Sequence, residues 1–209
     1  MRNRTTKQWS NWWKNRHINW KEQYIDTTDH PHRGLLLKAL ESMKWFSLFE
    51  IGTGAGANLI NIVRHFKKVQ VGGIDINKDA IETAKHYLQG ALLKVGSAED
   101  IMLSDNSVDV ILTDMSLMYI SPLEIDKVIK EMKRIGRNYV VLCELTSHSW
   151  WEQLKFFWSS GYHAHNYKKL LEKHEFWDIM EYKLPKEAWP GGDQEKIGYI
   201  IIARINKRK

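Results

Sequence analysis

The sequence predicts an α/β fold with a seven-stranded, mostly parallel sheet, helices on both faces and an antiparallel hairpin at the C-terminal end. Strand-like apolar runs alternate with helical patterns along most of the 209 residues, which is typical of a parallel sheet covered by helices. A glycine-rich turn, residues 52–56, marks the first crossover from a strand to a helix. The last two strand patterns are joined by a loop without a helix, so the final strand should run antiparallel.

The composition is that of an ordinary globular domain, with 43% hydrophobic and 27% charged residues. A chain of this length suffices for one domain with a full core. No apolar run approaches the ~20 residues of a membrane-spanning helix, and the first residues lack the apolar core of a secretory signal. Because Cys143 is the single cysteine, an internal disulfide is excluded and a reducing compartment fits, so we expect a cytoplasmic protein without membrane insertion.

The net charge of +6 is concentrated at the two ends of the chain, in residues 2–16 and 207–209. Such charge permits attraction to RNA or to anionic surfaces without requiring it. We interpret the basic ends as solvated tails.

Residues 1–44 are predicted to form a helical lead-in to the main domain, residues 45–209. Its aromatic residues fall near helical spacing, and Pro31 stands at the expected start of a helix over residues 31–44. Packing of the lead-in on the domain is the simplest interpretation, and a lid over a ligand is the functional one. The aromatic residues concerned are Trp9, Trp12, Trp13, Trp20 and Tyr24.

The main domain alternates strands and helices. Strands are predicted at residues 45–51, 69–74, 91–95, 108–113, 139–145, 176–184 and 197–205. Helices are predicted at residues 57–66, 78–88, 122–134, 147–160 and 167–174, with Asn77 as the cap of the second and Pro122 opening the third. Residues 185–195 should form a loop.

The segment around the first crossover carries the strongest functional signal. Gly52 and Gly54 permit a tight turn and let the backbone lie against a ligand. With Ala57 they fit the dinucleotide pattern, and Asp75 lies at a suitable distance for a ribose-binding acid. Glu50, however, would repel a pyrophosphate, whereas it suits a ligand that carries an amine and a sulfonium charge.

The run Glu50, Gly52, Gly54 and Gly56 resembles the first motif of class I S-adenosylmethionine-dependent methyltransferases. The resemblance extends over about residues 20–205, with specific motifs in the first half, and it implies that family's seven-stranded sheet. It also implies S-adenosylmethionine as the cofactor. The implied cofactor site consists of Glu50, Gly52, Thr53, Gly54, Gly56, Asp75, Ile76, Ser97, Ala98, Glu99 and Asp114.

Each part of that implied site has its own chemistry. Asp75 would bind the two ribose hydroxyls, because a carboxylate accepts two hydroxyl hydrogens at once, and Ile76 would pack on adenine. Family members often carry an acid where this chain has Ser97. We therefore expect adenine contacts from Ser97 and the Ala98 amide, with Glu99 as a substitute acid.

Catalytic candidates follow the fourth and fifth strands, whose carboxyl ends face the ligand in such sheets. His148 is the preferred general base, because imidazole titrates near neutral pH, with a surface histidine as the structural alternative. Asp114 and Tyr119 are expected to face the methyl acceptor, with a capping Asp and a core Tyr as the structural alternative. Asp114 lacks the prolines typical of enzymes that methylate the amino groups of bases. His163 and His165 alternate but lack further ligands, so no metal is expected.

The sequence thus predicts an enzyme, an S-adenosylmethionine-dependent methyltransferase acting on the hydroxyl or amine of a small molecule, with saccharides among the candidates. An RNA methyltransferase is the alternative, with RNA as partner, because the basic tails and aromatic residues could contact phosphates and bases. A non-catalytic protein that retains the cofactor pocket and an oxidoreductase are the remaining hypotheses.

Overall fold

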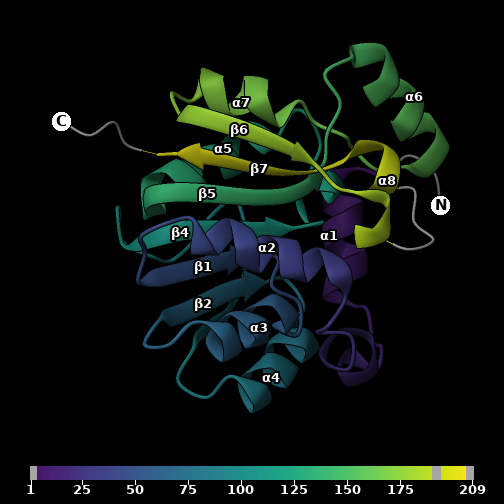
Figure 1. The fold of residues 1–209 in the computed structure, drawn as a ribbon. Coiled ribbons are helices and arrows are strands. Elements are labelled where there is room, and N and C mark those ends of the chain that lie inside the picture. The colour runs from purple at the N-terminus through teal and green to yellow at the C-terminus, as the bar shows by residue number, and fades with distance from the viewer. Residues whose placement is uncertain (1–3, 190–193, 206–209) are drawn as a thin grey trace.

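A computed structural model describes residues 4–189 and 194–205. These residues form a seven-stranded sheet in the order β3-β2-β1-β4-β5-β7-β6 (Figure 1). The strands are β1 (Ser47–Ile51), β2 (Gln70–Asp75), β3 (Leu92–Val95), β4 (Val108–Asp114), β5 (Gly136–Leu145), β6 (Trp177–Lys183) and β7 (Gly198–Arg204). β7 lies between β5 and β6 and is antiparallel to both, whereas β1 to β5 are parallel. The predicted fold class is therefore confirmed.

Helices cover both faces of this sheet. They are α1 (Thr6–Lys14), α2 (Pro31–Glu41), α3 (Ala57–His65), α4 (Lys78–Tyr87), α5 (Ile125–Ile135), α6 (Trp150–Ser160), α7 (Tyr167–Lys173) and α8 (Gln194–Ile197), with the π-helix η1 (Lys21–Ile25) and the short 3-10 helices η2 (Leu117–Tyr119) and η3 (Lys186–Ala188). Asn77 caps α4 as predicted, because its side chain accepts a hydrogen bond from the Ala80 amide at 2.9 Å.

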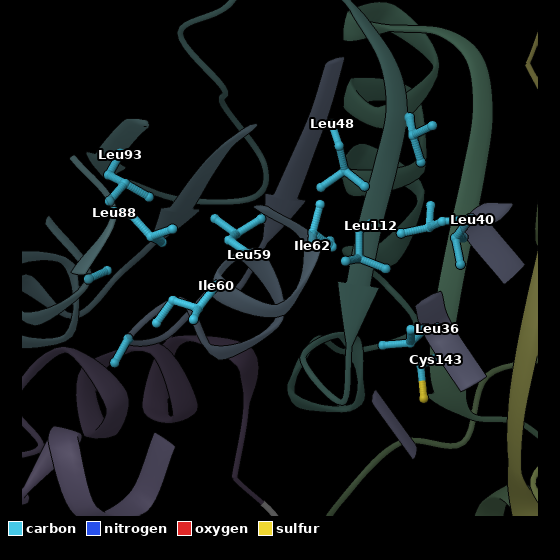
Figure 2. Close-up of a cluster of buried hydrophobic side chains, with 14 of the residues drawn as sticks. Leu36, Leu40, Leu48, Leu59, Ile60, Ile62, Leu88, Leu93, Leu112 and Cys143 are labelled. Atoms are coloured by element: carbon cyan, nitrogen blue, oxygen red, sulfur yellow. The ribbon is translucent and has the colours of Figure 1, made fainter. Parts of the chain in front are cut away.

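Alternation along the strands divides the core into two layers. Leu48 on β1 packs with α2, α3 and α4 on one face of the sheet (Figure 2), and its neighbour Phe49 packs with α5 and α7 on the other. Cys143 is fully buried in the first layer. None of the helices in the described residues combines the length and apolarity that spanning a membrane requires.

Two predicted elements differ from the observed ones. The helix expected from Pro122 begins at Ile125, because residues 121–124 form a turn in which the Ile125 amide donates to the Ser121 carbonyl oxygen at 3.0 Å. The loop expected at residues 185–195 contains η3, and α8 begins at its end. Residues 190–193 of that loop, like the basic residues 207–209, lie outside the described residues.

Candidate active site

The glycine turn predicted after the first strand lies at the carboxyl end of β1. Gly52 has φ of 75°, and a Cβ atom there would lie 2.4 Å from the Cβ of Ser116. Gly56 has φ of 82°, and a Cβ atom there would lie 2.7 Å from the Leu88 side chain. Only glycine fits both positions, the first because another loop approaches closely and the second because α3 packs on α4.

A cavity of about 510 Å³ opens at this turn, a size within the range of roughly 300–1,000 Å³ usual for small-molecule sites. The carboxyl ends of β1, β2 and β4 form one side, and residues 6–33 of the lead-in form the other. The expected site residues that line it are Glu50, Gly52, Thr53, Gly54, Asp75, Ile76, Ser97, Ala98, Glu99, Asp114 and Tyr119. Gly56 and His148 do not line it.

Glu50 lies buried in the floor of the cavity. Its carboxylate accepts hydrogen bonds from the Asn58 side-chain amide and the Thr53 hydroxyl, both at 2.7 Å. Burial raises the pKa of Glu50 to about 8, although the two hydrogen bonds oppose this. In the free protein Glu50 is therefore mostly neutral at pH 7, and a cationic ligand would favour its ionised form.

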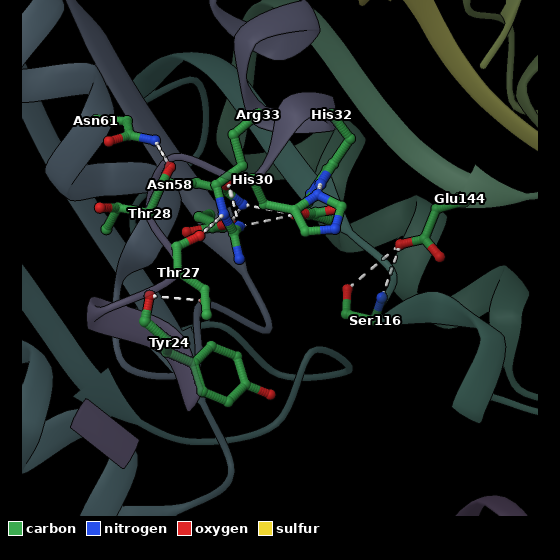
Figure 3. A network of polar contacts seen from close by, with 12 residues as sticks. Tyr24, Thr27, Thr28, His30, His32, Arg33, Asn58, Asn61, Ser116 and Glu144 are labelled. Carbon is green, nitrogen blue, oxygen red and sulfur yellow. Dashed lines mark hydrogen bonds and ion pairs between the residues drawn. The ribbon is translucent and has the colours of Figure 1, made fainter. Parts of the chain in front are cut away.

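Asp114 is the second buried carboxylate of the floor, and Figure 3 shows its partners His32, Arg33 and Asn58. Its Oδ2 accepts from His32 Nε2 at 2.8 Å and from Asn58 Nδ2 at 2.9 Å, and Arg33 Nη1 lies at 3.4 Å. Although burial opposes ionisation, the charges and hydrogen bonds of His32, Arg33 and Asn58 lower the pKa of Asp114 to about 2. Asp114 is consequently ionised, while Glu50, joined to it through Asn58, is not.

Two histidines extend this network along the cavity wall. His32 Nδ1 lies 2.6 Å from His30 Nδ1, and both rings pack against Trp189. Burial, followed by the charges of His32 and Arg33, lowers the pKa of His30, so its ring is neutral near pH 7. Asp114, His32 and His30 thus form one hydrogen-bonded chain that ends at a neutral imidazole.

Asp75 supports the glycine turn from β2. Its two carboxylate oxygens accept from the backbone amides of Gly54 and Asn77, each at 2.8 Å. Burial raises its pKa, and these amides oppose the rise. Both oxygens retain further lone pairs, so the carboxylate can also accept from hydroxyl groups of a ligand.

Residues 48–138 match the family model of a methyltransferase domain. This match identifies a methyltransferase domain over less than half of the chain, and the fold is that of solved S-adenosylmethionine-dependent methyltransferases. The carboxyl groups of Glu50, Asp75 and Asp114 line the cavity, which agrees with S-adenosylmethionine, because its sulfonium and amino groups outnumber its one carboxylate. A pyrophosphate would face the same carboxylates, which disfavours the dinucleotide alternative.

Solved structures with the same fold include three related chains. The YcgJ protein of Bacillus subtilis shares 16% identity at a TM-score of 0.67, covering 86% of this chain and 100% of that one. A Thermotoga maritima SAM-dependent methyltransferase shares 16% identity at a TM-score of 0.65, covering 95% of this chain and 98% of that one. The methyltransferase solved in complex with the Haloferax volcanii Trm112 activator shares 15% identity at a TM-score of 0.67, covering 91% of this chain and 96% of that one. No curated protein matches the chain.

Several residues that line the cavity were not predicted as site residues from the sequence. Asn58 bridges Glu50 and Asp114 and also accepts from Arg33 Nη1 at 2.8 Å. The one sequence feature that could have indicated Asn58 is its position as a polar residue in the first turn of α3. Tyr24, from η1, covers the glycine turn: a Cβ atom on Gly54 would lie 3.1 Å from its ring. His30 and Arg33 belong to the lead-in, residues 1–44, which was expected only to pack on the domain or to cover a ligand.

The methyltransferase does not bring His148 to the cavity. The His148 side chain is half exposed, and its Nε2 lies 3.5 Å from Glu181 Oε1. The segment turns away because two hydrogen bonds hold Thr146 between neighbouring segments. The Thr146 amide donates to the Ile197 carbonyl oxygen, and the Thr146 hydroxyl donates to the His165 carbonyl oxygen. The geometry gives no support to His148 as the general base.

Glu144, four residues earlier, instead supports the methyltransferase site from β5. Its Oε1 accepts from the backbone amides of Ser116 at 3.0 Å and Leu117 at 3.1 Å. This fixes the turn that follows β4 and approaches Gly52. Burial raises the pKa of Glu144 to about 7.

Tyr119 belongs to an aromatic wall of the cavity. Its ring contacts Trp9 at 5.0 Å and Trp13 at 5.3 Å between centroids, and Tyr162 packs behind it at 5.5 Å. Burial raises the pKa of Tyr119, so its hydroxyl is neutral at physiological pH. A catalytic role for Tyr119 stays a prediction.

The two other expected histidines serve packing. His163 stacks on Phe157 at 4.7 Å, and buried His165 places Nε2 2.9 Å from the Ile120 carbonyl oxygen. Across residues 4–189 and 194–205, no three His, Cys, Asp or Glu side chains are grouped so that they could hold a metal ion.

Proposed function

We propose that the protein transfers a methyl group from S-adenosylmethionine to a hydroxyl or amine of a small molecule. The observation that carries this proposal is the cavity enclosed between the sheet edge and the lead-in. Trp9 and Trp20 of the lead-in are buried, and the Asn77 side chain donates to the carbonyl oxygens of Trp13 and Arg16 at 2.7 and 2.9 Å. A lead-in anchored in this way favours a compact acceptor over a folded RNA.

In this proposal residues 1–44 are the lid and residues 45–209 are the cofactor-binding domain. Glu50 and Asp114 take the methionyl amino group, and Arg33 takes its carboxylate, because these charges are matched and share one network. Asp75 takes the ribose hydroxyls. Ile76, Ser97, Ala98 and Glu99 surround adenine, while Gly52, Thr53 and Gly54 present backbone to the cofactor.

The bound cofactor supplies a methyl group on a sulfonium, which is an excellent leaving group. The protein must then align the acceptor, exclude water and remove a proton. Ionised Asp114 can only accept hydrogen bonds, so His32 Nε2 carries the proton of their 2.8 Å contact. His32 Nδ1 and His30 Nδ1 share one proton, and the proposal places it on His30, which then donates to His32.

This arrangement of protons leaves the lone pair of His30 on Nε2. Because His30 lines the cavity and its pKa is lowered, Nε2 is free to accept the proton of an acceptor hydroxyl. We therefore assign His30 as the general base, with His32 and Asp114 as the residues that orient it. An amine acceptor, which enters neutral, would depend less on this base.

The test uses the purified protein, labelled methyl donor and a fractionated cell extract. Label should appear in small molecules, and label in RNA would overturn the acceptor assignment in favour of the alternative. His30→Gln should bind the cofactor as the unaltered protein does and transfer methyl groups roughly a hundredfold more slowly. Full activity in His30→Gln would remove the base assignment, and tight cofactor binding without transfer to any fraction would support a non-catalytic role.

His148→Gln is the matched control for that experiment. It makes the same change in a histidine that lies outside the cavity. It should leave both cofactor binding and methyl transfer unchanged. A loss of transfer in His148→Gln alone would restore the sequence-based assignment of the base.

A further inference from the structure

Helix α6 presents apolar side chains that the fold does not use. No residue of α6 is buried, and Trp150, Trp151 and Trp158 are 61%, 64% and 58% exposed. Figure 1 shows α6 standing away from the sheet, at the same end of the molecule as α1 and α8. Large exposed apolar side chains gathered on one element usually mark an interaction surface.

The exposed residues lie on one side of the helix. At 100° per residue, Trp150, Leu154, Trp158 and Trp151 fall within an arc of about 100°. Lys155 borders this arc, about 40° beyond Trp151, and Ser159 and Glu152 lie farther round the helix. Phe156 points away from the arc and packs in the small cluster with Met118, Leu145 and Ala164. The apolar arc therefore faces outward although the helix is attached to the domain.

This surface adjoins the cavity. The C-terminal cap of α6 is Gly161, whose carbonyl oxygen accepts a hydrogen bond from Trp9 Nε1 at 3.4 Å. Trp9 lines the cavity and also packs on Tyr162 at 5.3 Å between ring centroids. Whatever α6 contacts is consequently held beside the aromatic wall of the cavity.

We propose that α6 is an interfacial helix that docks the protein on a lipid surface containing anionic headgroups. Tryptophan settles at the boundary between headgroups and acyl chains, and an amphipathic helix with Trp, Phe and Leu on one side lies in that plane. Eleven residues are too few to cross a bilayer, so the contact is peripheral. This proposal is independent of the methyl acceptor proposed above.

Charge favours the anionic surface. α1, which touches the end of α6, carries the exposed Lys7 and Lys14 and no acidic residue, and the whole chain has a net charge of +6. A nucleic acid fits less well. Leu154 lies between the tryptophans, Lys155 is offset by Glu152, and Trp150 already stacks on Trp151 at 3.9 Å.

The test compares the unaltered protein with the triple variant Trp150→Ser, Trp151→Ser, Trp158→Ser. Flotation with phosphatidylcholine vesicles, with and without phosphatidylglycerol, measures binding. Binding should be stronger with phosphatidylglycerol and fall by roughly tenfold or more in the triple variant. Met102→Ser is the control, because Met102 is 78% exposed near β3, at the other end of the sheet. It should bind vesicles as the unaltered protein does.

Binding of S-adenosylmethionine by the triple variant shows that it is folded and reports separately on the proposed function. Absence of vesicle binding by the unaltered protein, or equal binding by the triple variant, would overturn the docking proposal. So would tryptophan-dependent binding to single-stranded RNA in place of vesicles. Self-association that the triple variant abolishes, without vesicle binding, would likewise assign the surface to a second copy of the chain.

Discussion

Replacing Glu50 by Gln removes a buried ionisable group while retaining the shape of the side chain. The glutamine oxygen can accept from the Asn58 amide, and its amide can donate to the Thr53 hydroxyl, so both contacts of Glu50 persist. The substitution therefore isolates the ionisation of Glu50 from its hydrogen bonds. We expect it to change how the free energy of unfolding depends on pH.

The sign follows from the raised pKa. The native state holds the Glu50 proton up to about pH 8, whereas the unfolded chain releases it near 4.5. Glu50 therefore favours the native state fully below pH 4.5, and this contribution is lost as the pH rises to about 8. At about 1.4 kcal/mol for each pH unit, the loss amounts to at most about 5 kcal/mol.

Urea unfolding of the cofactor-free protein from pH 5 to 9 measures this difference. Glu50→Gln should gain stability relative to the unaltered protein as the pH rises, with the difference levelling off above about pH 8. Glu144→Gln is the matched control. Because the pKa of Glu144 is about 7, the stability difference between Glu144→Gln and the unaltered protein should level off at a lower pH than for Glu50→Gln. Parallel pH profiles for the unaltered protein and Glu50→Gln would refute the reasoning.

The same residue should couple cofactor binding to proton release. At pH 7 the free protein holds Glu50 mostly neutral, and a bound cationic amine would favour its ionised form. Calorimetry in buffers of different ionisation enthalpy should detect up to about one proton released per S-adenosylmethionine bound. Release should vanish in Glu50→Gln. Equal release by both proteins would mean that Glu50 does not sense the cofactor.

Three further predictions concern the surrounding residues. Gly56→Ala should lower the free energy of unfolding by about 1–3 kcal/mol in urea titrations, because φ is 82° and Leu88 lies in the way, without changing a residue of the cavity. Asn58→Ala should cost about 1–3 kcal/mol of stability at neutral pH and weaken cofactor binding in calorimetry, because Asp114 loses a donor. The initial rate of His30→Gln should remain low across the pH range in which the unaltered enzyme gains activity. Unchanged stability in Gly56→Ala, unchanged cofactor binding in Asn58→Ala, or an unchanged pH profile in His30→Gln would each contradict the role given to that residue.

The fold could be predicted from the sequence because its signals are local. Alternation within a strand, the order of strands and helices, and the Asn77 cap each depend on residues a few positions apart. The glycine turn, Glu50 and Asp75 were found for the same reason, since one crossover fixes their places at the sheet edge. Asp114 followed from its position at the end of a buried strand.

Tertiary packing alone decided which side chains complete the cavity. His32 meets Asp114 across 82 positions, and Trp9 reaches Gly161 across 152, so no local pattern could pair them. His148 follows the fifth strand, where a base was expected, yet the contacts of Thr146 turn its segment away from the cavity. Spacing along a chain determines secondary structure, but the direction of a side chain after a strand depends on what packs against it.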